Sequence, residues 1–115
     1  AGESGAARAL AGYLSLQHVE HPEQGCPLPS LTPEVGRADE ATKEAFQAGL
    51  LRIHEVLQRV TACPEDAWAY LAQNVGGVML ARALADEKVQ RELLTALRRA
   101  GEKLLAIKPA AGPTR

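Results

Sequence analysis

Apolar residues recur at intervals of three and four along most of the chain, the spacing that gathers them on one face of an α-helix. The first such stretch predicts a helix over residues 5–19, which His21-Pro22 and Gly25 would end. Pro27, Pro29 and Pro33 then interrupt the pattern. We therefore expect only a short helical turn there, with Thr32 as its cap and Pro33 at its first position.

The pattern resumes after Asp39, a suitable N-terminal cap, and predicts a helix over residues 40–61. One face of this helix is apolar, and its members are Phe46, Leu50, Ile53, Leu57 and Val60. His54 is assigned to the other side, with Gln47, Leu51 and Gln58, and is expected to be exposed to solvent.

Two further helices follow. Pro64, Glu65 and Asp66 form a start signal, because proline suits the first turn and acids suit the positive end of the helix dipole. The stretch over residues 67–85 is apolar on nearly every face, so this helix is expected to be buried on all sides. Asp86 is expected to cap a last helix over residues 87–107, and residues 109–115 are expected to form a disordered tail.

The glycine pair Gly76-Gly77 lies inside the helix at residues 67–85, where each glycine costs about 1 kcal/mol relative to alanine. Close approach of another backbone, or a kink beside a cavity, would offset this cost.

The predicted fold class is all-α, an antiparallel helical bundle. Only two other substantial helices are present to cover the last two, so a second copy of the chain would complete the core. We therefore expect a homodimer that pairs the last two helices of each copy in a four-helix bundle. The candidate interface residues are Gly76, Met79, Leu80, Ala83, Leu93, Leu97 and Leu104. A monomeric bundle with exposed leucines is the alternative.

Composition narrows the class of protein. The chain has 115 residues, enough for one domain with its own core, which we place at residues 1–108. The net charge of −1 leaves no basic face for phosphates, so we expect no specific DNA affinity from these residues. The apolar stretch at 67–85 is interrupted by Gln73, Asn74 and Arg82, which favours a buried helix over a membrane span. No signal-peptide pattern is present, and a cytoplasmic protein is expected.

Motifs for catalysis and metal binding are missing. Cys26 and Cys63 form no metal-ligand spacing, and Pro22 disrupts the helix that could present His18 and His21 together. The sequence holds no nucleophile elbow, no phosphate-binding glycine loop and no HExxH motif. We therefore expect no enzyme activity, no catalytic residue, no metal and no cofactor.

A set of residues between Tyr13 and Leu57 carries a family resemblance: Tyr13-Leu14-Ser15, His18, Pro22, Gly25-Cys26-Pro27-Leu28, Leu31, Glu34-Val35, Asp39 and Phe46. This run resembles the C-terminal domain of TetR-type transcriptional regulators. The proline-rich residues 27–33 depart from the family, in which this stretch is usually an alanine-rich helix.

The resemblance implies a domain that binds a small-molecule effector and forms the dimer. Effector binding would change the separation of two N-terminal helix-turn-helix domains and hence their fit to operator half-sites. Nothing in the sequence looks like such a domain, which would have to precede Ala1. The resemblance also implies that His18 ties down the loop after the first helix.

The resemblance favours an effector pocket over simple core packing by aromatic side chains, which would explain the same residues. The candidate pocket residues are Tyr13, Gln17, Cys26, Phe46, Leu50, Trp68, Leu71 and Val75. In some TetR-like regulators a cysteine in this region senses electrophiles or oxidants, so a thiol-based sensor centred on Cys26 is one alternative function. A free-standing helical protein-interaction domain is another.

Overall fold

The computed structural model describes residues 5–106, and this part of the chain is all-helical. The predicted helical class is confirmed. Apart from an isolated bridge between Thr61 and Leu105, the described residues contain no β-structure. The helices, with one short 3₁₀ turn, are α1 (Gly5–Tyr13), α2 (Leu16–Glu20), η1 (Pro22–Gln24), α3 (Leu28–Val35), α4 (Glu40–Leu57), α5 (Pro64–Arg82) and α6 (Glu87–Leu104).

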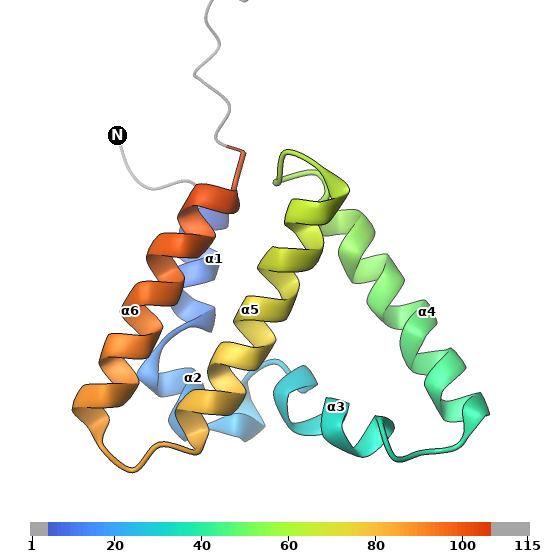
Figure 1. The fold of residues 1–115 in the computed structure, drawn as a ribbon, viewed down its shortest axis with the longest axis horizontal. Helices are drawn as coiled ribbons and strands as arrows, with labels where there is room; N and C mark the ends of the chain where they lie inside the picture. Colours follow the sequence, from blue (N-terminus) through green and yellow to red (C-terminus); the bar gives the residue numbers. More distant parts are fainter. Residues whose placement is uncertain (1–4, 107–115) are drawn as a thin grey trace, which may run out of the picture.

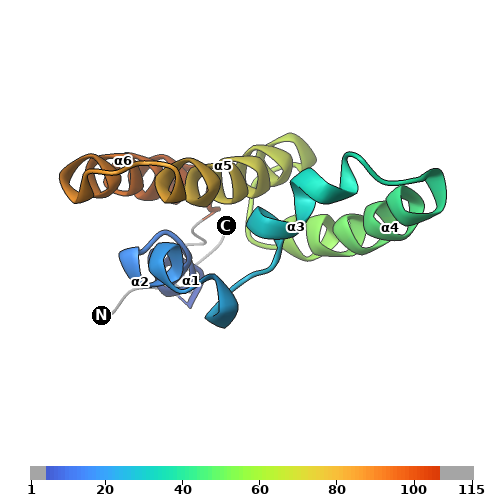
Figure 2. The same cartoon turned by 90° about the horizontal axis from the view of Figure 1, so that it is seen from below.

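Helix α5 is the centre of the fold. It lies side by side with the antiparallel α6, and α3 and α4 flank its other side (Figure 1). Figure 2 shows α1 and α2 as a second layer beside the α5–α6 pair. The molecule measures 51 × 38 × 21 Å, so its short dimension is about two helix diameters.

The main core lies where α1, α5 and α6 meet. Leu10, Leu14 and Val78 are its fully buried large side chains, and they cluster with Leu94 and Leu105. Gly77 faces α6, and a Cβ atom at this position would overlap the Leu97 side chain. The absence of a side chain at Gly77 therefore lets α5 and α6 approach closely.

The single first helix predicted for residues 5–19 is wrong, because Ser15 divides it into α1 and α2. The Ser15 hydroxyl donates to the Gly12 carbonyl at 2.7 Å and accepts from the His18 amide at 3.2 Å. Serine side chains compete in this way with the hydrogen bonds of a continuous helix. Ser15 is the N-terminal cap of α2.

The proline-rich segment also differs from its prediction, since α3 begins at Leu28 and not at Thr32. Pro27 and Pro29 occupy the first turn, where the missing amide hydrogen costs no helical hydrogen bond. Pro33 lies inside the helix. The helix continues past it, and the Gly36 amide donates to the Thr32 carbonyl at 3.0 Å.

Both predicted aspartate caps are confirmed. Asp39 accepts from the Thr42 amide and Asp86 from the Lys88 amide, each at 2.8 Å. The C-terminal ends were predicted three or four residues too late for α4 and α5, which end at Leu57 and Arg82.

The end of α4 has a local cause, since the Thr61 hydroxyl donates to the Leu57 carbonyl at 2.8 Å. Helix α6 ends at Leu104, and the Ala106 amide donates to the Val60 carbonyl at 2.8 Å. The predictions for Ile107 and for residues 109–115 lie outside the described residues.

Helix α5 is not buried on all sides within one chain. Trp68 is 41% exposed and Leu80 is 60% exposed. None of the described helices is both long enough and apolar enough to cross a membrane.

Candidate ligand-binding site

Two apolar cavities adjoin along α5. The first, of about 240 Å³, is lined by Ala9, Tyr13, Cys26, Leu28, Ile53, Leu57, Tyr70, Leu71, Asn74 and Val75. The second, of about 350 Å³, is lined by Leu28, Thr32, Phe46, Leu50, Trp68, Leu71, Ala72, Val75, Gly76 and Met79. Leu28, Leu71 and Val75 belong to both walls, so these side chains divide one apolar space into two parts. Among the described residues, no charged side chain lines either cavity.

Helical spacing explains how three helices build the second cavity. Each contributes a pair of residues four apart, which lie on one helix face: Leu28 and Thr32 on α3, Phe46 and Leu50 on α4, Leu71 and Val75 on α5. The prolines at the start of α3 therefore matter to the site, because they allow the helix to begin early enough to present Leu28.

The structure brings seven of the eight sequence-predicted pocket residues to these cavities. Tyr13 and Cys26 line the first, Phe46, Leu50 and Trp68 line the second, and Leu71 and Val75 line both. The eighth, Gln17, lies instead at a third and more polar cavity. Leu28, Tyr70 and Asn74 are wall residues that the sequence analysis missed.

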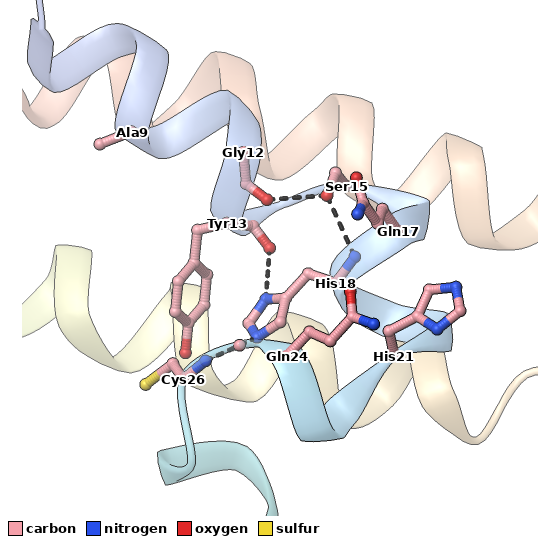
Figure 3. A pocket seen from close by; sticks show the side chains of 10 residues that line it. Ala9, Gly12, Tyr13, Ser15, Gln17, His18, His21, Gln24 and Cys26 are labelled. Carbon is pink, nitrogen blue, oxygen red and sulfur yellow. Dashed lines mark hydrogen bonds between the residues drawn. The ribbon is translucent and has the colours of Figure 1, made fainter.

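The third cavity, of about 330 Å³, lies between α1, α2 and the loop that follows η1 (Figure 3). His18 organises this region. The Cys26 amide donates to Nε2 of His18 at 3.1 Å, so the ring proton is on Nδ1, which donates to the Tyr13 carbonyl at 2.8 Å. The loop is thus held against the end of α1, and the expected role of His18 is confirmed. A Cβ atom at Gly25 would overlap the His18 ring.

Tyr13 forms the wall between the polar cavity and the first apolar cavity. Its ring meets the His18 ring edge-on at 4.6 Å between centroids. Burial raises the pKa of the Tyr13 phenol strongly, and the neighbouring Cys26 thiol raises it further, against a smaller opposing effect of Arg82. The phenol is therefore neutral at physiological pH.

Tyr70 is the second tyrosine of the first apolar cavity. Burial raises the pKa of its phenol, and a hydrogen bond with Asn74 partly offsets that rise. Asn74 is itself buried and accepts from Nε2 of Gln73 at 3.0 Å. The Asn74 amide of this wall is therefore paired, whereas no geometric hydrogen bond is made by the Tyr13 hydroxyl.

The prediction that His54 is exposed is wrong. Its side chain is only 7% exposed and stacks on Trp68, with 3.9 Å between ring centroids. His54 Nε2 donates to the Pro64 carbonyl at 3.0 Å, and Gln58 donates to Nδ1 at 3.2 Å. A sequence signal for this placement existed, because position 54 follows Leu50 by four residues and precedes Leu57 by three.

The residues predicted to form a dimer interface fall into three groups. Gly76 and Met79 line the second cavity. Leu80 on α5 and Ala83, the C-terminal cap of this helix, are exposed. Leu93, Leu97 and Leu104 pack, partly buried, against the core of their own chain.

Among residues 5–106, no three side chains of histidine, cysteine, aspartate or glutamate are grouped so that they could hold a metal ion. Comparison of the chain with protein-family models, with curated proteins and with solved structures found no match.

Proposed function

We propose that this chain is the ligand-binding and dimerisation domain of a TetR-like transcriptional regulator. A small apolar molecule binds along α5 and thereby controls DNA binding by a helix-turn-helix domain that the printed sequence does not contain. The proposal rests on the resemblance of residues 13–57 to that family. The single observation that carries it is the pair of adjoining apolar cavities along α5.

The size and chemistry of the cavities suit a small ligand. Protein sites for small molecules typically enclose about 300–1,000 Å³, and most of their walls are apolar with a few polar groups. The two cavities, of about 240 and 350 Å³, fall in that range when occupied together. Their walls combine leucine, valine and aromatic side chains with a small number of uncharged polar groups.

The proposed coupling runs through α5. Gly76 and Met79 border the second cavity, and Leu80 is exposed on the same helix, next to the exposed cap residue Ala83. A ligand between α4 and α5 that favours one separation of these helices also favours one shape of the α5 surface. In the proposed dimer, that shape sets the distance between the two DNA-binding domains and their fit to half-sites.

The test uses a matched pair of exposed alanines on α5. Ala72 lines the second cavity, and Ala69, three residues earlier, lies outside both cavities. The probe is the uncharged dye N-phenyl-1-naphthylamine, and the reporter is the fluorescence of Trp68, the single tryptophan of the chain and a wall residue. We expect saturable binding that quenches Trp68.

Ala72→Phe fills part of the cavity and should weaken dye binding about tenfold or more, the effect of losing about 1.4 kcal/mol of contact energy. Ala69→Phe adds the same side chain outside the cavity and should leave dye binding unchanged. Circular dichroism and thermal melting check that both variants fold. Equal dye affinity of the two variants, or no saturable binding to the unmodified protein, contradicts the proposal.

A further inference from the structure

The hydroxyl of Tyr13 stands out among the polar groups of residues 5–106. It is the one side-chain nitrogen or oxygen in this part of the chain that is fully buried and has no hydrogen-bond partner. Buried polar groups in folded proteins are nearly always paired, since an unmade hydrogen bond leaves the cost of removing the group from water uncompensated. An unpaired buried hydroxyl at the wall of a cavity therefore points to a partner that the cavity receives.

The groups around Tyr13 supply at most a weak partner. The Cys26 thiol lies beside the hydroxyl, as Figure 3 shows, and a hydrogen-bonding interaction with it helps to raise the pKa of the phenol, but sulfur is a weak acceptor and the contact does not meet the geometry of a full hydrogen bond. Arg82 also acts on Tyr13 through its charge. Its guanidinium is committed to the Val19 carbonyl at 3.1 Å and the His18 carbonyl at 2.9 Å, and an arginine can only donate.

The same cavity contains an internal comparison. Tyr70 lines it as well, and the neighbouring Asn74 amide partly offsets the rise in the pKa of its phenol. The two tyrosines of the chain thus share one apolar cavity, Tyr70 beside an amide and Tyr13 beside the weaker thiol of Cys26. Burial keeps both phenols protonated, so Tyr13 offers a neutral O–H donor.

We propose that the first cavity takes an uncharged, mostly apolar molecule with one hydrogen-bond acceptor, such as a ketone, ester or ether oxygen, and that the Tyr13 hydroxyl donates to it. This inference rests on the proposed function and specifies the class of its ligand. The ligand is uncharged because the cavity wall has no charged side chain. The hydroxyl is fully buried in the ligand-free chain, so this binding mode requires the Cys26 side chain or the phenol ring to move when the ligand enters.

The experiment uses three probes that share one aromatic ring: toluene without an acceptor, acetophenone with a neutral acceptor, and benzoate with a charge. Dissociation constants are measured by NMR titration for the unmodified protein, Tyr13→Phe and Tyr70→Phe. Tyr13→Phe should weaken acetophenone relative to toluene about tenfold, the effect of one lost hydrogen bond to a buried donor. Tyr70→Phe removes the other phenol of the same cavity and should change this ratio clearly less than Tyr13→Phe does, and benzoate should bind weakest.

A second measurement concerns the free protein. Because the Tyr13 hydroxyl has no partner, Tyr13→Phe should leave the melting temperature unchanged or raise it, whereas Tyr70→Phe should lower it. A lower melting temperature for Tyr13→Phe means that the hydroxyl already has a partner, and this overturns the inference.

The binding outcomes separate the inference from the proposed function. In one outcome, toluene and acetophenone both bind while Tyr13→Phe changes their two dissociation constants by the same factor. In that case the cavity binds ligands but Tyr13 does not distinguish between them, which contradicts the inference and leaves the proposed function standing. If benzoate binds best, the ligand class is wrong. If none of the probes binds, the proposed function and the inference fall together.

Discussion

Among single residues, Asp39 has the charge with the clearest structural effect. Hydrogen bonds from the side chain and the backbone amide of Thr42 lower the pKa of its carboxyl group. A carboxylate whose pKa is lowered by folding stabilises the folded state at any pH above its unfolded pKa of about 3.9. That contribution is lost as the pH falls from about 4 through the lower pKa of the folded state.

Asp39→Asn should therefore remove an acid-dependent part of the stability at the start of α4. Asparagine caps helices about as well as aspartate, so the variant should keep the helix at neutral pH. Hydrogen exchange of the Thr42 amide between pH 5 and 2 provides the measurement. In the unmodified protein protection should decrease toward pH 2, and in Asp39→Asn it should change less.

Glu44→Gln is the control, since it removes a carboxylate from α4 beyond its first turn. The same pH profile in the unmodified protein and in Asp39→Asn would show that the carboxylate of Asp39 does not stabilise this helix end.

The sequence predicted individual residues best where their role is local. The caps Asp39 and Asp86 depend on neighbours two or three positions away and were predicted correctly. Burial of His54 depends on Trp68 and Pro64, which belong to another helix. Whether the Tyr13 hydroxyl has a hydrogen-bond partner depends on all the residues packed around it, and these come from several elements. A local sequence pattern cannot predict it.

Among elements, the two adjacent glycines of α5 lead to opposite predictions. A Cβ atom at Gly77 would overlap Leu97 of α6, whereas one at Gly76 would have no neighbouring atom within 4 Å. Gly77→Ala should therefore destabilise the protein by about 1–3 kcal/mol through overpacking. Gly76→Ala should stabilise a single chain by up to about 1 kcal/mol, because alanine favours the helix.

Urea denaturation measures both free energies of unfolding. Equal effects of the two substitutions would mean that α6 does not pack against α5 through Gly77.

Helix positions followed from the sequence more reliably than helix ends. The long helices α4, α5 and α6 have strong start signals and clear periodicity, and all three begin at or next to the expected residue. Their C-terminal ends have weaker signals and were placed too late. The break at Ser15 was missed because the apolar periodicity continues through it. The early start of α3 was missed because prolines in a first turn look like an interruption of a helical pattern.

The whole molecule is more open than a closed domain of its size. Its radius of gyration is 15.6 Å, whereas a compact domain of about 100 residues has a radius of gyration of about 13 Å. The apolar side chains of Leu80 on α5 and Val56 on α4 are 60% and 54% exposed. We expect a second copy of the chain to cover the α5 side.

Leu80→Glu should convert the expected dimer to a monomer, with self-association weakened about tenfold or more, because an unpaired charge would be buried in the interface. Val56→Glu places the same charge on α4 and should leave the dimer intact. Sedimentation equilibrium of the unmodified protein and both variants measures their self-association. A monomeric unmodified protein at every concentration would contradict the dimer, and would favour an interaction domain for a different partner.

The core joins the two ends of the described chain. Leu10 of α1 and Leu14, which follows this helix, share one cluster with Leu94 and Leu105, and the Ala106 amide donates to the Val60 carbonyl. Contacts between residues so distant in sequence form late, because the intervening chain must first lose its freedom. During synthesis on the ribosome, the apolar face of α1 is therefore covered only after α6 has been made. The nascent chain should stay sensitive to proteases until α6 has emerged from the ribosome.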